Sequence, residues 1–136
     1  MIGNKQNLVK DGMKTKVKKV LVVDDDPVLV RLVKEILKSQ GFTVETAKDG
    51  IDAMVMVKKD KPDLIVLDIM MPELNGYDVL RALKFTDDFK DIPVLLLTAR
   101  EQELDKRIGD MMGIDYLQKP VHRESFLEKI NKMFRS

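Results

Sequence analysis

The sequence predicts an α/β fold in which five βα units are arranged around a parallel sheet. Short apolar runs rich in Val, Ile and Leu alternate with segments of helical period, and this alternation is typical of repeated βα units. The 136 residues are about the length of one ordinary domain. We expect that domain to occupy residues 17–136, after a flexible, Lys-rich N-terminal extension at residues 1–16.

An apolar run and helix-capping residues define the first unit. Residues 20–23 form the first strand, and Pro27 suits the first turn of a helix that Asp26 caps. Gly41 should end this helix. Six apolar positions recur at helical spacing and should face the sheet: Val28, Leu29, Leu32, Val33, Ile36 and Leu37.

The next three strands differ in their apolar pattern. Residues 42–47 alternate apolar and polar side chains, as an edge strand does, whereas residues 64–67 and 94–97 are unbroken apolar runs, as central strands are. A helix is predicted at residues 49–59 and ends before Pro62. Its inward-facing candidates are Met54, Val55 and Val57.

The remaining elements follow from the same patterns. Helices are predicted at about residues 75–84, 101–112 and 124–134, a short strand at 114–118, and a loop at 85–91. The apolar faces of the first and last of these helices consist of Tyr77, Leu80 and Leu83, and of Phe126, Leu127, Ile130, Met133 and Phe134.

The charge distribution argues against nucleic-acid binding by the domain. Residues 1–19 contain six Lys and one Asp, which leaves 18 basic and 22 acidic residues in the rest of the chain. A mildly acidic body lacks the clustered basic face of nucleic-acid-binding domains. No apolar run approaches the roughly 20 residues that span a bilayer, and the chain has no Cys. We therefore expect no membrane insertion and a cytoplasmic location.

Polar side chains follow the predicted strands at their carboxyl ends, where ligands bind in open parallel α/β sheets. Asp68 is the strongest candidate, because an ionisable group that closes a run of four apolar residues is costly without a partner. The full set is Asp24, Asp25 and Asp26 after the first strand, Asp68 after the third, Thr98 after the fourth, and Lys119 with Pro120 after the fifth.

A divalent cation would relieve the repulsion within such an acidic cluster. Mg²⁺ prefers oxygen ligands and keeps several waters, so two carboxylates, a backbone carbonyl and a phosphoryl oxygen would suit it. The absence of Cys and the single histidine make zinc improbable. That histidine, His122, is expected to be solvent-exposed near a helix start.

Four blocks of the sequence resemble the receiver domains of bacterial two-component response regulators. They are residues 22–27 (VVDDDP), 64–72 (LIVLDIMMP), 97–99 (LTA) and 119–120 (KP), in family order within residues 17–134. Each block alone is weak, but together they are specific. The resemblance, closest to single-domain chemotaxis regulators, implies a doubly wound (βα)5 flavodoxin-like fold: a five-stranded parallel sheet of order 2-1-3-4-5 with helices on both faces.

The resemblance also implies the role of each acidic residue. Asp68 would accept a phosphoryl group and contribute to a Mg²⁺ site, which could also take Mn²⁺. Asp25 would bind the metal directly and Asp24 through water, and the backbone carbonyl of Met70 would be a further ligand. The Met70 side chain would influence how fast the phosphoryl group is hydrolysed.

The other site residues would act on the phosphoryl group or respond to it. By resemblance, Thr98 and Lys119 contact phosphoryl oxygens, and the peptide bond before Pro120 is cis. Thr98 and Tyr116 would form the switch, and Arg100 would influence hydrolysis. Two departures from the family pattern are Asp26, where Glu is more usual, and a loop one residue shorter before the last strand.

The implied function is that of a phosphorylation switch. A sensor histidine kinase or histidine phosphotransfer protein would donate its phosphoryl group to Asp68, which would reshape the surface of helix 4, strand 5 and helix 5 for a downstream target. The family pattern also allows a phosphorylation-dependent homodimer. Such a protein catalyses its own phosphotransfer and dephosphorylation and is a signalling phosphoacceptor rather than a conventional enzyme.

Two other functions are compatible with parts of the sequence. A small phosphatase of the haloacid dehalogenase type would use Asp24 as nucleophile and Asp26 as acid, supported by Thr98 and Lys119, but would leave Asp68 without a role. A degenerate binding module would retain the fold without being phosphorylated. Substitution of Asp68 separates the three functions.

Overall fold

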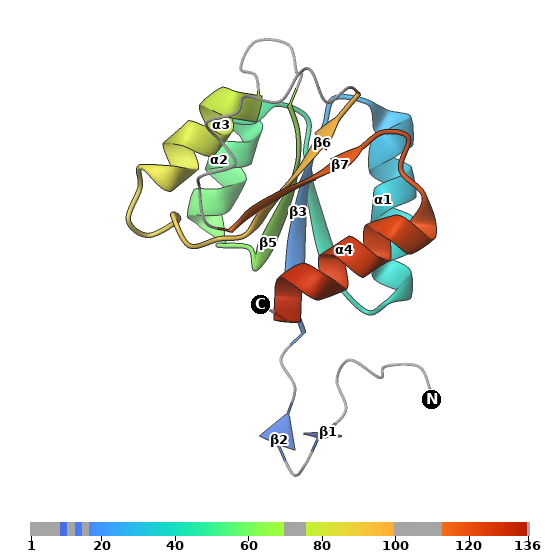
Figure 1. The fold of residues 1–136 in the computed structure, drawn as a ribbon. Helices are drawn as coiled ribbons and strands as arrows, with labels where there is room; N and C mark the ends of the chain where they lie inside the picture. Colours follow the sequence, from blue (N-terminus) through green and yellow to red (C-terminus); the bar gives the residue numbers. More distant parts are fainter. Residues whose placement is uncertain (1–8, 11–12, 15–16, 70–75, 100–112, 136) are drawn as a thin grey trace.

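A five-stranded parallel sheet forms the centre of the computed structural model, which describes residues 9–10, 13–14, 17–69, 76–99 and 113–135 (Figure 1). The order β4-β3-β5-β6-β7 corresponds to 2-1-3-4-5 when the strands of this sheet are counted along the chain, which confirms the predicted topology. The strands are β3 (Lys19–Val23), β4 (Thr43–Ala47), β5 (Leu64–Asp68), β6 (Val94–Thr98) and β7 (Ile114–Gln118).

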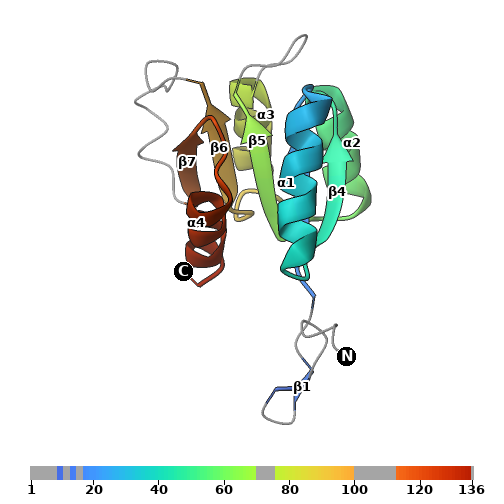
Figure 2. The same ribbon diagram turned by 90° about the vertical axis from the view of Figure 1, so that its right-hand side faces the viewer.

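Helices cover both faces of this sheet. Figures 1 and 2 show α1 and α4 on one face and α2 and α3 on the other. Each face of the sheet contributes to its own apolar cluster, because neighbouring residues of a strand point to opposite faces. The described helices are α1 (Pro27–Ser39), α2 (Gly50–Lys59), α3 (Gly76–Lys84) and α4 (Arg123–Arg135). The helix predicted at residues 101–112 lies outside the described residues.

Local sequence signals account for where the helices begin and end. The Asp26 carboxylate accepts a hydrogen bond from the Val28 amide at 3.0 Å and caps α1, as predicted. Asp49 caps α2 in the same way through the Asp52 amide, at 2.8 Å. After α1 the chain turns at Gly41, whose φ of 91° is in the left-handed region that favours glycine.

Three predicted inward-facing positions are wrong. Val28 is 75% exposed, Leu32 is 41% exposed, and Val55 on α2 is 58% exposed. The six apolar positions of α1 span about half of the helix circumference, more than the sheet can cover, so only Val33, Ile36 and Leu37 are fully buried. On α2, Ala53 and Val57 occupy the inward face instead.

The N-terminal extension contains a small sheet of its own. Strands β1 (Val9–Lys10) and β2 (Met13–Lys14) pair antiparallel, and Figure 1 shows them below the α/β layers. The division into an extension and a domain at residues 16 and 17 stays a prediction. Among the described helices, none has both the length and the apolar character required to cross a membrane.

Candidate functional site

The carboxyl ends of β3, β5 and β6 bring three polar side chains to one edge of the sheet. Asp24 follows β3, and Asp68 and Thr98 are the last residues of β5 and β6. The register places Val23 beside Leu67, and Asp68 beside Leu97. Asp24, Asp68 and Thr98 are all buried, and most of the residues around them in these strands are aliphatic. Burial of polar groups in this setting requires partners.

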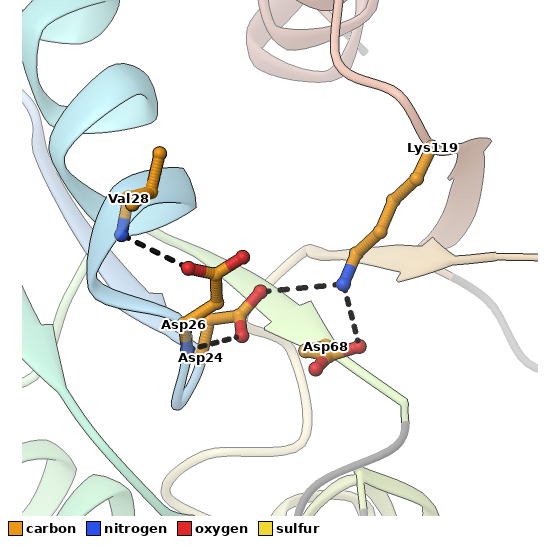
Figure 3. A network of polar contacts seen from close by, with 5 residues as sticks. All are labelled: Asp24, Asp26, Val28, Asp68 and Lys119. Atoms are coloured by element: carbon orange, nitrogen blue, oxygen red, sulfur yellow. Dashed lines mark hydrogen bonds and ion pairs between the residues drawn. The ribbon is translucent and has the colours of Figure 1, made fainter.

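Lys119 supplies a positive partner from the end of β7. Its ammonium nitrogen lies 3.3 Å from Asp68 Oδ1 and 3.5 Å from Asp24 Oδ2, so it bridges the two buried carboxylates (Figure 3). Its backbone amide donates to the Thr98 carbonyl oxygen at 2.7 Å, and the peptide bond between Lys119 and Pro120 is cis. The structure therefore brings together four of the residues that the sequence singled out.

The loop after β3 holds Asp24 in place. The Asp24 amide donates to the Ala47 carbonyl oxygen of β4 at 3.1 Å, and Asp24 Oδ1 accepts a hydrogen bond from the Asp26 amide at 3.0 Å. The adjacent Asp26 carboxylate caps α1 (Figure 3). Asp24 thus faces the site, whereas Asp26 has a structural role.

Three carboxylates of this edge have the chemistry of a site for a hard divalent cation. Ligand oxygens of Asp24, Asp25 and Asp68 all lie within 4.8 Å of one another. Asp24 Oδ2 is buried and accepts no hydrogen bond from the residues that the structure describes, although the Lys119 ammonium lies 3.5 Å away. Asp25 is exposed and would give the cation access to water. An all-oxygen donor set with an open side fits Mg²⁺, which retains part of its water shell.

The charges and burial of the site residues are unfavourable for an ionised Asp24. Burial is the largest effect on the pKa of Asp24 and, together with the neighbouring Asp68 charge, raises it from 3.8 to about 6 against the opposing effects of the Asp26 amide and Lys119. Burial alone would lower the pKa of Lys119, but the charges of Asp24 and Asp68 outweigh it and raise that pKa. Lys119 therefore remains an ammonium group, and a bound cation would stabilise the ionised form of Asp24.

The remaining predicted residues lie around this centre or outside the described residues. Tyr116 on β7 is 44% exposed, and His122 is exposed, as predicted. Met70 and Arg100 lie outside the described residues. Sequence reasoning missed Gln118, whose amide group donates to the Ala99 carbonyl oxygen at 3.3 Å and links β7 to the segment after Thr98. A polar residue at the end of a predicted strand, directly before Lys119 in the sequence, was the signal that could have indicated this contact.

Comparison with known proteins identifies the family. The family model of the response regulator receiver domain matches residues 20–131. This chain belongs to that family. Among curated proteins, it is 42% identical over 118 residues to the response regulators MprA of Mycobacterium ulcerans and of Mycobacterium leprae, matching 86% of this chain. It spans about half the length of these relatives, 50% and 51% respectively.

Solved structures of receiver domains share the fold. The chemotaxis response regulator CheY4 of Vibrio cholerae is 31% identical with a TM-score of 0.79, over 87% of this chain and 99% of that chain. The receiver domain of the sensor histidine kinase PA1611 from Pseudomonas aeruginosa is 27% identical with a TM-score of 0.80, over 89% and 100% of the two chains. That structure has a magnesium ion coordinated in its active site cleft.

The chain is thus a receiver domain of the two-component type, and the haloacid dehalogenase alternative does not hold. Receiver domains bind Mg²⁺ in an acidic site and are phosphorylated by histidine kinases. In this structure Asp24, Asp25 and Asp68 form an acidic cluster, and the Lys119 ammonium lies beside two of these carboxylates.

Proposed function

We propose that Asp68 accepts a phosphoryl group from the phosphohistidine of a sensor histidine kinase or a histidine phosphotransfer protein. The observation that carries the proposal is the position of Asp68: it is a buried carboxylate at the end of a central strand, 3.3 Å from the Lys119 ammonium and beside two further carboxylates. Such an arrangement is costly for stability and suits the binding of a dianionic group together with a cation.

The proposed reaction is an in-line displacement at phosphorus. A carboxylate oxygen of Asp68 forms the new O–P bond while the P–N bond to the donor histidine breaks, and the electron pair stays on the imidazole nitrogen. Asp24 and Asp25, with Asp68 and the Met70 carbonyl, would hold Mg²⁺, which supplies positive charge to the phosphoryl oxygens when bound. Mn²⁺ would substitute for it. Lys119 pairs with a phosphoryl oxygen, so its charge stabilises the transition state.

The response to phosphorylation would involve Thr98 and Tyr116. The buried hydroxyl of Thr98 lies at the end of β6, where it can donate to a phosphoryl oxygen on Asp68. Tyr116 lies on the neighbouring strand, paired with Leu96, and is 44% exposed. A shift of these residues would alter the surface formed by β7 and α4, to which a downstream target or a second phosphorylated copy would bind.

The contact with the donor protein is best supplied by the start of α1. Val28 and Leu32 lie one turn apart on this helix, are exposed, and follow directly on the acidic loop. Exposed apolar side chains at the start of the helix that follows the acidic loop offer a partner contact that a small-molecule donor does not need. The reaction would take place in the cytoplasm, where ATP renews the phosphohistidine of the kinase.

Mass spectrometry after incubation with acetyl phosphate tests the proposal. We expect one phosphoryl group on the wild-type protein with Mg²⁺, none after chelation of the metal, and none on Asp68→Asn. As a matched control, Asp63→Asn changes a carboxylate at the opposite end of β5 and should be labelled normally. Equal labelling of Asp68→Asn, or phosphate located at Asp24, would refute the assignment, and absence of labelling would favour a degenerate module.

A further inference from the structure

The backbone that carries Asp68 is in unusually close contact with the first residue of α3, Gly76. The Gly76 amide donates to the Ile69 carbonyl oxygen at 2.6 Å. A Cβ atom added to Gly76 would lie 2.6 Å from the Ile69 Cα atom and 3.0 Å from its carbonyl oxygen, and nearer still to the carbonyl oxygen of Asp68. Each of these neighbours is backbone, which cannot rotate away as a flexible side chain could.

The same stretch of backbone is held from its other side by the sheet. Asp68 pairs with Leu97 in the β5–β6 ladder, and the Ile69 amide donates to the Leu97 carbonyl oxygen at 3.1 Å. The Ile69 side chain is fully buried, so this segment has no space into which it could retreat. The main chain at Asp68 is therefore confined between β6 and the N-terminus of α3.

We propose that Gly76 is a positioning residue for the phosphoacceptor, an inference that rests on the proposed function of Asp68. Its missing side chain lets α3 approach the backbone closely enough to fix the Asp68 carboxylate relative to Asp24, Asp25 and Lys119. Any side chain at residue 76 forces either α3 or the end of β5 to move, because real Cβ atoms essentially never come within 3.0 Å of such neighbours. Mg²⁺ requires near-ideal octahedral geometry, and small displacements of reacting groups are expensive, so the site is sensitive to that movement.

Helix propensity alone predicts that replacing Gly76 by Ala does no harm. Ala is favoured over Gly within helices, so Gly76→Ala would be neutral or stabilising if residue 76 served only the helix. The close backbone contacts predict instead that Gly76→Ala loses Mg²⁺ affinity and phosphorylation rate, each by about tenfold or more.

Two control variants separate positioning from general loss of stability. Val79→Ala removes buried side-chain volume from the same helix, without adding an atom next to Asp68. Gly41→Ala makes the same substitution at a strained φ of 91° at the opposite edge of the sheet. Both should lower the melting temperature and retain the wild-type affinity for Mg²⁺.

The test is calorimetric titration of Mg²⁺ and acetyl phosphate labelling of all four proteins, below their melting temperatures. If Gly76→Ala is unfolded in buffer, trimethylamine N-oxide added to all four favours the folded state. Wild-type affinity and rate in Gly76→Ala, or an equal loss in Val79→Ala, would overturn the positioning role. Failure of the wild-type protein to be labelled would overturn the proposed function instead, and the Mg²⁺ titration would still decide the role of Gly76.

Discussion

Asp24→Asn should stabilise the metal-free protein near neutral pH, although it removes a residue of the proposed metal site. Asp24 is buried, and its burial raises its pKa from 3.8 to about 6. A shift of about 2 pH units corresponds to about 3 kcal/mol of unfavourable free energy when the group is ionised. Asn has the shape of the neutral acid and can still accept the Asp26 amide hydrogen bond. The expected gain is therefore at most about 3 kcal/mol.

The sign of the pH dependence follows from the direction of the shift. Between pH 3.8 and about 6 the unfolded chain loses the Asp24 proton more readily than the folded protein does, so the contribution of Asp24 to stability falls as pH rises through this window. Well below pH 3.8 the Asp24 carboxyl is protonated in both the folded and the unfolded protein, and the advantage of Asn disappears. The difference between variant and wild type should thus be largest near neutral pH and close to zero at about pH 3.

Urea unfolding followed by circular dichroism, with a metal chelator present and at a series of pH values, measures this difference. Asp26→Asn is the matched control, because Asn caps helices as well as Asp does and Asp26 is exposed. Added Mg²⁺ should stabilise the wild type and have less effect on Asp24→Asn. If Asp24→Asn gave no gain near neutral pH, or the same gain at about pH 3, burial of the ionised carboxylate would not be the cause.

Two further predictions concern the donor and the lifetime of the phosphoryl group. Val28→Ser with Leu32→Ser should slow transfer from a phosphorylated kinase about tenfold and leave acetyl phosphate labelling unchanged, because only a protein donor contacts α1. Val55→Ser, an exposed valine on the opposite face, is the control, and equal slowing with both donors would contradict the docking role. Met70→Asn with Arg100→Ala should speed loss of phosphate about tenfold, or about 1.4 kcal/mol of barrier. Met70 cannot orient water by hydrogen bonding whereas Asn can, and Arg100 is long enough to cover the phosphoryl group whereas Ala is not. Decay at the wild-type rate with saturating Mg²⁺ would show that these side chains do not control the water.

Local sequence patterns were sufficient to predict most of the secondary structure. The strand at residues 114–118 was predicted with the bounds that the structure has, and Asp26 is the predicted cap of α1. These features depend on neighbours within a few residues, which is the range over which apolar period and capping act. The relative order of the strands came from family resemblance, because the pattern of one strand contains no information about its partner.

The inward faces of the helices were predicted less well for a physical reason. Val28, Leu32 and Val55 belong to apolar patterns but are exposed, because the area that the sheet offers to each helix is smaller than the apolar face of that helix. Exposed apolar residues are common on protein surfaces, so composition alone does not reveal them. Only the packed layers show which side of each pattern is covered.

By itself, the sequence determined that polar candidate residues follow four of the five predicted strands and that Asp68 is the most costly of these to bury. The tertiary structure decided that Lys119 lies between Asp24 and Asp68, since these three residues come from three different strand ends. It also decided that Gly76 has no space for a Cβ atom behind Asp68. Such contacts join residues far apart in the chain or across a packed layer, and they exist only once the sheet and helices have assembled.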